Sequence, residues 1–267
     1  MSATFDVYVP GRSWLHRADP RVKILYVALV TMLQLLWFNV PLFVLLLLLT
    51  HVALVAAGIS WRRIGTLWRA ILPFLILIAV LWPIFAREGT PVLLHLGPLL
   101  LTGQGLLGGL ATALRFAAIS FSFIVWLATT DQRALVRSFV RLGMPYKLGM
   151  SLTIGLRFIP TFAALFQSVS EAQQSRGLLL EGRGFSRARA MIPILIASLV
   201  TALRMSEQLG WTLEARGFGA PTRRTTLYDL SMRSIDWLLC AALVTLFVVL
   251  LVLTFRYGFG RSLLRLE

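Results

Sequence analysis

The sequence predicts an all-α integral membrane protein with about five transmembrane helices and a cytoplasmic block of long amphipathic helices. Composition is the first reason: 58% of the 267 residues are hydrophobic and 14% are charged, whereas soluble domains contain about 45–50% apolar and about 25% charged residues. The second is a set of long apolar stretches. The third is a net charge of +15 without any nucleic-acid-binding motif, which indicates basic cytoplasmic loops facing anionic lipid and no nucleic-acid partner.

Five stretches approach the roughly 20 apolar residues that cross a hydrocarbon core of about 30 Å. They are residues 22–38, 40–59, 67–85, 105–128 and 235–255. Asn39 and Pro41 stand between the first two and predict a tight helical hairpin. No small-residue cleavage site follows the first stretch, so we expect a retained helix there and no cleaved signal peptide.

Basic residues set the expected orientation, because loops rich in arginine and lysine stay in the cytoplasm. They precede the first stretch and separate the second from the third, at Arg12, Arg17, Arg21, Lys23, Arg62, Arg63 and Arg69. The N-terminus is therefore expected in the cytoplasm of a bacterium, with the protein in its cytoplasmic (inner) membrane. Five spans would place the C-terminal tail outside, where three further arginines contradict the rule, so the side of the tail stays open.

We expect three parts: residues 1–128 with four transmembrane helices, residues 129–234 as a cytoplasmic domain, and residues 235–267 with the last span and the tail. The middle part carries 14 basic and 6 acidic residues. It contains two long helical patterns, at 147–177 with a kink at Pro160 and at 187–217 through Pro193. The apolar run 191–203 within the second is interrupted by Pro193 and is too short for a span, which favours an interfacial or buried helix.

A short amphipathic helix is expected before them, at 131–142, ended by Gly143 and Pro145. Its two faces carry apolar residues on one side and arginines on the other: Leu135, Phe139 and Leu142 against Arg133, Arg137 and Arg141. Basic amphipathic helices commonly lie on a membrane surface.

The two long helical patterns end alike, in Ser175-Arg176-Gly177 and Ala215-Arg216-Gly217. A glycine that adopts positive φ ends a helix and leaves the arginine projecting, which predicts docking onto a partner. The alternative is an arginine that only complements the helix dipole before a glycine cap. Gly182-Arg183-Gly184 has a similar composition and ranks below both.

Small residues follow one face of the fourth span, at Gly105, Gly109, Ala113 and Ala117. A four-residue spacing of such residues lets another helix approach closely. Arg115 lies on roughly the opposite face. An ion pair with Glu171 or Glu207, satisfaction by backbone carbonyls and a functional role all remain open for it.

Residues for catalysis are not grouped anywhere in the sequence. The three histidines have no metal-ligand spacing, no phosphate-binding Gly-x-x-x-x-Gly-Lys-Ser/Thr loop is present, and the single cysteine, Cys240, excludes an internal disulfide. We expect a non-catalytic membrane subunit that binds no metal and no cofactor of its own.

Several short motifs occur in a characteristic order: 13–23 (Ser-Trp-Leu-His-Arg-Ala-Asp-Pro-Arg-Val-Lys), Thr129-Thr130, 142–145 (Leu-Gly-Met-Pro), 157–160 (Arg-Phe-Ile-Pro), 172–177 and 213–218. Together they resemble the transmembrane T component of energy-coupling factor (ECF) transporters over nearly the whole chain. The resemblance implies an ATP-driven importer in which two ABC-type ATPase subunits, which bind the ATP, are coupled to a membrane-embedded substrate-binding S component. The long helices would then be coupling helices, and Arg176 and Arg216 would insert into grooves of the ATPases.

Apolar residues along the same two helices would face the S component, unless they pack on the protein's own spans: Phe158, Phe162, Leu165, Ile196, Leu199 and Leu203, with Ile154 and Ile194 beside them. The S component holds the substrate in this family, so biotin, another vitamin, cobalt and nickel all remain open. Two other classes of transporter are alternatives. A conventional ABC importer permease would share part of its coupling loop with 171–177, and a secondary transporter would need two similar halves, which the sequence lacks.

Overall fold

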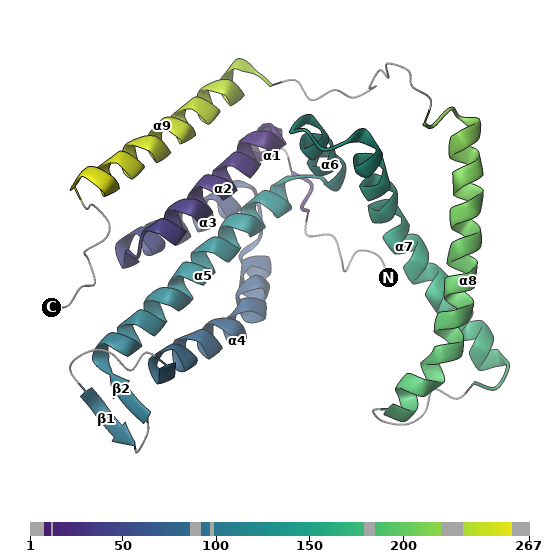
Figure 1. The fold of residues 1–267 in the computed structure, drawn as a ribbon, viewed down its shortest axis with the longest axis horizontal. Helices are drawn as coiled ribbons and strands as arrows, with labels where there is room; N and C mark the ends of the chain where they lie inside the picture. Colours follow the sequence, from purple (N-terminus) through teal and green to yellow (C-terminus); the bar gives the residue numbers. More distant parts are fainter. Residues whose placement is uncertain are drawn as a thin grey trace. The chain divides into compact units, whose positions relative to one another are not determined.

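The computed structural model describes residues 8–11, 13–85, 92–96, 99–178, 185–219 and 232–257 (Figure 1). Nearly all of these residues are helical, as the sequence predicts. The elements are α1 (Trp14–Arg17), α2 (Pro20–Leu36), α3 (Val40–Ala56), α4 (Trp61–Phe85), β1 (Val92–Leu96), β2 (Leu99–Thr102), α5 (Gly103–Thr129), α6 (Gln132–Arg141), α7 (Tyr146–Ser175), α8 (Phe185–Ala215) and α9 (Ser234–Tyr257).

The chain forms two compact units. The first, the membrane unit, contains residues 1–142 and 230–267, and the second, the inserted unit, contains residues 143–229. The boundaries differ from the expected 129 and 234, because α6 packs with the membrane unit. The inserted unit is therefore an insertion between α6 and α9.

Polar residues cap three helices of the membrane unit. Each accepts a hydrogen bond from a backbone N–H in the first turn, which would otherwise lack a partner. The pairs are Asp19 with Arg21 at 2.9 Å, Asn39 with Leu42 at 3.3 Å and Thr102 with Gly105 at 3.1 Å. Asn39 and Pro41 form the expected turn between α2 and α3.

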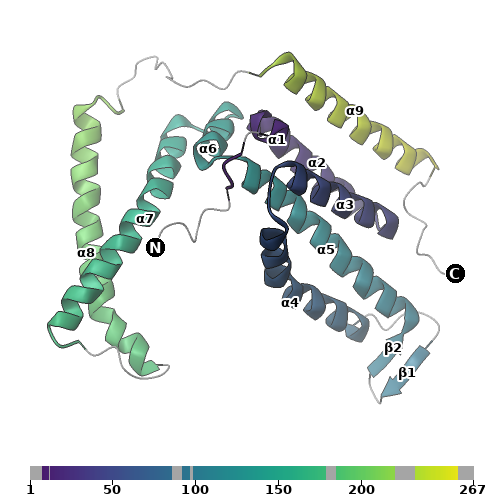
Figure 2. The same ribbon diagram turned by 180° about the vertical axis from the view of Figure 1, so that it is seen from behind.

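Helix α5 is the centre of the membrane unit, and α2, α3 and α4 pack around it (Figures 1 and 2). Its buried Phe121 and Val125 share an apolar cluster with Leu54 of α3 and Ile64 of α4. The small residues on α5 face α4: Ala113 and Ala117 pack on Leu75, and Gly109 lies beneath Ala79 and Pro83. A second helix therefore approaches along the face for which close packing was predicted.

Replacing Gly109 by alanine is expected to destabilise the membrane unit. The added Cβ would lie 2.8 Å from the Ala79 carbonyl oxygen and 3.1 Å from Pro83 Cδ, and overpacking of this kind costs about 1–3 kcal/mol. Gly65→Ala is the matched control, because nothing lies within 4 Å of a Cβ there. Thermal unfolding of the detergent-purified chain should show a lower midpoint for the first variant alone; equal midpoints would contradict the close approach.

His51 is a satisfied core residue. The Trp68 indole donates to His51 Nε2 at 2.9 Å, and the other ring nitrogen, Nδ1, lies 2.7 Å from the Leu47 carbonyl oxygen. Since an indole N–H can only donate, the imidazole is neutral with its proton on Nδ1. The rings of His51 and Phe121 have centroids 4.5 Å apart. His51 of α3 therefore contacts both Trp68 of α4 and Phe121 of α5.

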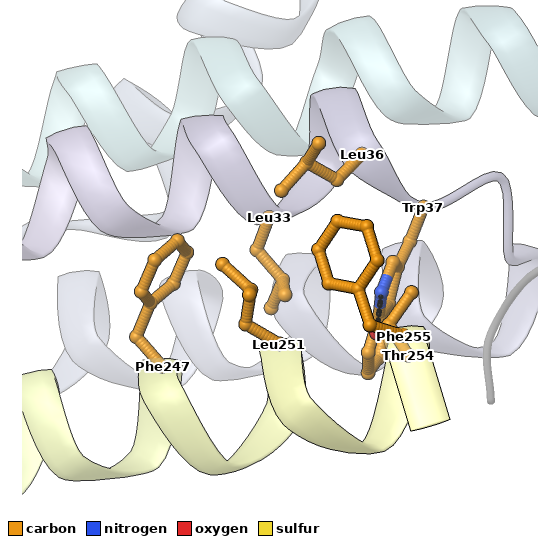
Figure 3. A pocket seen from close by; sticks show the side chains of 7 residues that line it. All are labelled: Leu33, Leu36, Trp37, Phe247, Leu251, Thr254 and Phe255. Atoms are coloured by element: carbon orange, nitrogen blue, oxygen red, sulfur yellow. Dashed lines mark hydrogen bonds between the residues drawn. The ribbon is translucent and has the colours of Figure 1, made fainter. Parts of the chain in front are cut away.

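Helix α9 packs against α2. At its far end the Trp37 indole donates to Thr254 Oγ1, and both residues are buried. Figure 3 shows this hydrogen bond at the edge of a small pocket, which Phe247 and Leu251 of α9 line together with Leu33 of α2.

The set of helices able to cross a membrane differs from the expected one. By length and composition the described chain contains five: α4, α5, α7, the segment Ala188–Ala215 of α8, and α9. Helices α2 and α3 have 17 residues each, about 25 Å at 1.5 Å per residue, which is less than the hydrocarbon thickness. The number five is as expected, but α7 and α8 qualify in place of the first two stretches.

The helix expected to run through Pro193 is confirmed, but the expectation that its apolar part is too short for a span is wrong. Pro193 lies inside the continuous helix α8, and Pro160 likewise lies inside α7. The apolar part of α8 is therefore longer than the run 191–203, and length alone gives no reason to keep it out of a membrane.

Two short strands lie between the third and fourth apolar stretches, where no strand was predicted. An antiparallel hairpin of β1 and β2 lies there, with Leu96 opposite Leu99 and Val92 opposite Thr102, and α5 begins directly after it. The two strands exchange backbone hydrogen bonds with each other, and no periodic apolar pattern marks so short a pair.

Helix α6 turns its predicted apolar side inward and leaves Arg133 and Arg141 of the other face exposed. Val136 and Ser138 are buried, whereas Leu142 is 57% exposed. Leu135 and Phe139 are half-buried, and Phe139 contacts Trp126 of α5 edge to face with ring centroids 6.5 Å apart. This side of α6 docks on α2 of the same unit, and Leu142 lies just beyond the last residue of the helix.

The inserted unit consists of α7 and α8, which cross and contact each other (Figures 1 and 2). Ile194 of α8 is 1% exposed and faces this contact. At the end of α8, the Phe218 ring lies against Tyr146 at the start of α7, with centroids 6.2 Å apart. The C-terminal end of α8 therefore lies next to the N-terminal end of α7.

Candidate docking site at two arginine-tipped helix ends

Helix α7 ends in a Schellman motif, the hydrogen-bonded C-terminal cap that a residue with positive φ permits. Gly177 has φ +90°. Its N–H donates to the Gln174 carbonyl at 2.9 Å, and the Leu178 N–H donates to the Gln173 carbonyl at 3.0 Å. Arg176 is the cap residue itself, at the point where the chain leaves the helix.

Helix α8 ends in the same motif with the same register. Gly217 has φ +71°, its N–H donates to Glu214 at 2.8 Å, and the Phe218 N–H donates to Leu213 at 2.9 Å. Arg216 again is the cap residue. The two similar tripeptides thus have the same backbone geometry, with the same two capping hydrogen bonds at each helix end.

Both arginines are exposed, together with the small residues that precede them, Ser175 and Ala215. Ser175 Oγ donates to the Glu171 carbonyl at 3.0 Å, so its side chain turns back along α7. Within the described residues, neither guanidinium shows an ion pair. Each presents up to five N–H donors in a planar fork that suits a carboxylate on another protein.

The apolar residues expected to face another membrane protein divide into two groups. Phe162, Ile196, Leu199 and Leu203 are 41–61% exposed, whereas Phe158, Leu165 and Ile154 are half-buried. On α8 the exposed residues follow one stripe at three- and four-residue spacing. Ile194 is 1% exposed and lies on the opposite side of α8, so for this residue the alternative of packing within the protein holds.

Arg115 has no acidic partner among the described residues. Its guanidinium carbon lies 6.0 Å from the centroid of the Phe43 ring, a cation–π arrangement, and its Nε is buried without a hydrogen-bond partner in the part of the chain that the structure describes. Glu171, one expected partner, accepts instead from Gln167 on its own helix at 3.0 Å.

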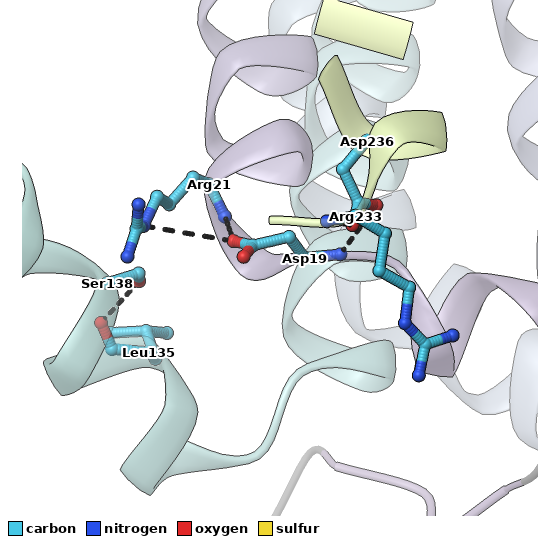
Figure 4. Close-up of polar contacts among 6 residues, drawn as sticks. All are labelled: Asp19, Arg21, Leu135, Ser138, Arg233 and Asp236. Carbon is cyan, nitrogen blue, oxygen red and sulfur yellow. Dashed lines mark hydrogen bonds and ion pairs between the residues drawn. The ribbon is translucent and has the colours of Figure 1, made fainter. Parts of the chain in front are cut away.

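A buried polar cluster, Asp19, Lys23 and Asp236, joins helix ends of the membrane unit. Asp236 Oδ2 accepts from the Arg233 N–H at 3.0 Å and caps α9, while its Oδ1 accepts from the Asp19 N–H at 3.3 Å (Figure 4). Lys23 Nζ donates to the last carbonyl of α5, that of Thr129, at 2.8 Å. The three charged residues are 3–7% exposed.

In the sequence, Asp19 and Thr129 stand out only as parts of motifs and Lys23 also as a basic residue that sets the orientation, whereas Asp236 is not singled out. Its signal was present: Asp236 is the single acidic residue of a largely apolar helix and lies in its first turn, where a carboxylate can cap the helix. Its partner could not be inferred, because Asp19 lies 217 residues earlier.

No group of three or more potential metal ligands occurs among the described residues. His16 lies 2.8 Å from both Ser13 Oγ and the Val9 carbonyl oxygen, and His51 is satisfied in the core. Cys240 is free. The segment 182–184, with Arg183, lies outside the described residues.

The fold and the two arginine-tipped ends define the class: a multi-pass membrane subunit with an inserted pair of long helices. The family model described as cobalt transport protein (CbiQ) matches residues 11–227, so the chain belongs to this family.

Similar proteins include three called energy-coupling factor transporter transmembrane protein EcfT. That of Macrococcus caseolyticus is 30% identical, covering 92% of this chain and 96% of the relative; that of Acidaminococcus fermentans is 32% identical, covering 96% and 97%; that of Exiguobacterium sibiricum is 33% identical, covering 94% and 98%. The resemblance described above is confirmed: the chain is a transmembrane component of the ECF transporter type and a multi-pass bacterial membrane protein. Membership favours this class over a conventional ABC permease or a secondary transporter.

Proposed function

We propose that this protein is the coupling subunit of an ECF-type importer, linking ATP hydrolysis by two separate ABC-type ATPase subunits to uptake of a substrate bound by an S component. The observation that carries the proposal is the pair of matching Schellman ends with exposed Arg176 and Arg216. Two tips with one backbone geometry fit two partners with like binding grooves. A role as helix cap alone would not require the same residue in the same register twice.

The ATPase-docking residues are Ser175, Arg176 and Gly177 on α7 and Ala215, Arg216 and Gly217 on α8. Each glycine ends its helix, each small residue leaves space beside the guanidinium, and each arginine supplies the charge. Rigid helices of 30 and 31 residues, about 45 Å long, would carry displacement of the tips to the rest of the subunit.

The apolar stripe of α8 supports contact with the S component. Ile196, Leu199 and Leu203 are exposed in the isolated chain, and contiguous apolar surface of this kind marks interaction with a protein or lipid. Phe162, Phe158 and Leu165 extend the apolar surface on α7. The substrate would be a vitamin, such as biotin, or a cobalt or nickel ion, held by the S component and not by this chain.

Co-expression tests the proposal. The tagged chain should copurify with two ATPase subunits and a small apolar membrane protein, and the complex should hydrolyse ATP. The chain purified alone should bind no nucleotide and hydrolyse none, because it contains no phosphate-binding loop. Hydrolysis by the single subunit, or a tagged chain that never captures an ATPase, would refute the proposed function.

A further inference from the structure

Arg115 lies in a layer of the membrane unit where α2, α3 and α5 meet. The three helices share one buried apolar cluster, to which each contributes one residue: Val30, Leu46 and Ala118. Because residues three or four apart lie on one helix face, the next turn of each helix, closer to the α2–α3 hairpin, contributes Gln34, Phe43 and Arg115 to the following layer. The guanidinium carbon of Arg115 lies 6.0 Å from the centroid of the Phe43 ring, which agrees with this arrangement.

The polar groups of this layer have unused hydrogen-bonding capacity. Gln34 is 0% exposed, yet neither its amide nitrogen nor its amide oxygen has a hydrogen-bond partner among the described residues. Arg115 Nε is likewise buried without a partner in the described chain, and its guanidinium forms no ion pair there. Buried polar groups without hydrogen bonds are uncommon and destabilising, and a charge inside a membrane is almost always paired. The layer is therefore suited to a group from another molecule.

The cover that α3 gives to α5 ends close to this layer. Phe121 of α5 is 0% exposed and packs with Leu54 of α3. Leu110 and Leu107 lie about three and about four helical turns earlier on nearly the same face, yet they are 61% and 44% exposed. Helix α5 continues past the α2–α3 hairpin toward β1 and β2 (Figures 1 and 2). An apolar surface therefore remains uncovered about one to two turns beyond Arg115.

The depth of Arg115 in the membrane indicates which anion it can meet. It lies near the middle of α5, which extends from Gly103 to Thr129. Its Cα is about 18 Å from the first residue and about 21 Å from the last, near the mid-plane of a hydrocarbon core about 30 Å thick. Lipid phosphates lie outside this core, more than about 15 Å from the mid-plane. A carboxylate on a membrane segment of another subunit can lie at the depth of Arg115, and it pairs with the planar guanidinium through two parallel hydrogen bonds.

We propose that Arg115 pairs with a carboxylate in a membrane segment of the S component, and that Leu107 and Leu110 form the apolar surface against which this segment packs. This rests on the proposed function, in which the S component is the membrane-embedded partner. Charge complementarity favours such a segment over a purely apolar one, because an apolar neighbour would leave the guanidinium unpaired. Gln34 adds an amide group, able to donate and to accept, to the same layer.

Arg115→Met in the complete transporter tests this. Methionine keeps an unbranched apolar stem and removes the charge. Purified, labelled S component is titrated against the complex of the tagged chain with its ATPases, and its dissociation constant should rise at least tenfold for Arg115→Met. Arg69→Met is the matched control: Arg69 is an exposed arginine of α4, about two turns after the first residue of that helix, and its loss should change the constant less than twofold.

Arg115→Lys separates the effect of charge from that of shape. An ammonium keeps the positive charge but not the planar fork, so this variant should bind the S component more tightly than Arg115→Met and less tightly than the wild type. Equal dissociation constants for Arg115→Lys and Arg115→Met would overturn a carboxylate as the bound group.

The isolated chain gives a second readout. An unpaired charge in a membrane costs more than one cation–π contact returns, so Arg115→Met should leave the thermal midpoint of the detergent-purified chain unchanged or raise it. A lower midpoint, or a variant that does not accumulate in membranes, would show that Arg115 serves the fold of its own chain and would overturn the inference.

Other occupants of this surface give different results. If Arg115→Met binds the S component normally but retains less phospholipid, the bound group is a lipid phosphate; if it abolishes a dimer of the isolated chain, the partner is a second copy. Either result, or unchanged affinity for the S component, overturns the inference while the proposed function stands. A wild-type chain that captures no ATPase would overturn the proposed function itself.

Discussion

Uptake is expected to be lost when Arg176 and Arg216 are both replaced by alanine, although the protein should insert and fold normally. Both residues are exposed cap residues, where truncation typically changes stability by less than about 0.5 kcal/mol. At an interface, removal of one partner from a buried charge pair costs about 2–5 kcal/mol, equivalent to roughly 30-fold to several thousand-fold in affinity at each site. Copurification of the ATPases and uptake into cells measure the two consequences.

The single variants should each weaken ATPase binding, and Arg→Lys should restore little, because an ammonium cannot reproduce the planar fork. Arg189→Ala is the matched control, since Arg189 is an exposed arginine near the start of α8; Arg183→Ala is a second. If the double variant copurifies with the ATPases and supports normal uptake, both arginines act only as helix caps. The proposed docking onto the ATPases would then be refuted.

Leu199→Asp is expected to release the S component while leaving the ATPases bound. Leu199 is 61% exposed in the middle of the apolar stripe on α8, so the isolated chain should tolerate a carboxylate there. In an apolar interface the same group would be a buried charge without a partner, which costs about 3–5 kcal/mol, or roughly two to nearly four orders of magnitude in affinity.

Trp211→Asn provides the control for that experiment. Trp211 is also on α8 and 68% exposed, but it lies about 18 Å further along the helix and about a third of a turn around it. Pull-down of the S component should fail for Leu199→Asp only. Equal recovery from both variants would show that the stripe of Ile196, Leu199 and Leu203 faces lipid or another surface.

The two helix ends could be predicted from the sequence because a Schellman motif is local. Its hydrogen bonds join residues three and five apart, and a glycine able to adopt positive φ completes it, so Gly177 and Gly217 identified both ends without knowledge of the fold. The close-packing face of α5 could also be predicted, since four-residue spacing places its small residues on one face of any helix. Composition alone determined the membrane class, because apolar surface of this extent needs lipid around it.

Tertiary structure decided which faces are buried and which distant residues pair. The buried side of α6 follows from docking on α2, and Ile194 is hidden because α8 crosses α7 on that side; helical periodicity assigns residues to faces but does not say which face meets a neighbour. Asp19 and Asp236 meet only because α2 and α9 begin at the same point of the membrane unit. A contact across 217 residues depends on the path of the whole chain, which no local pattern encodes.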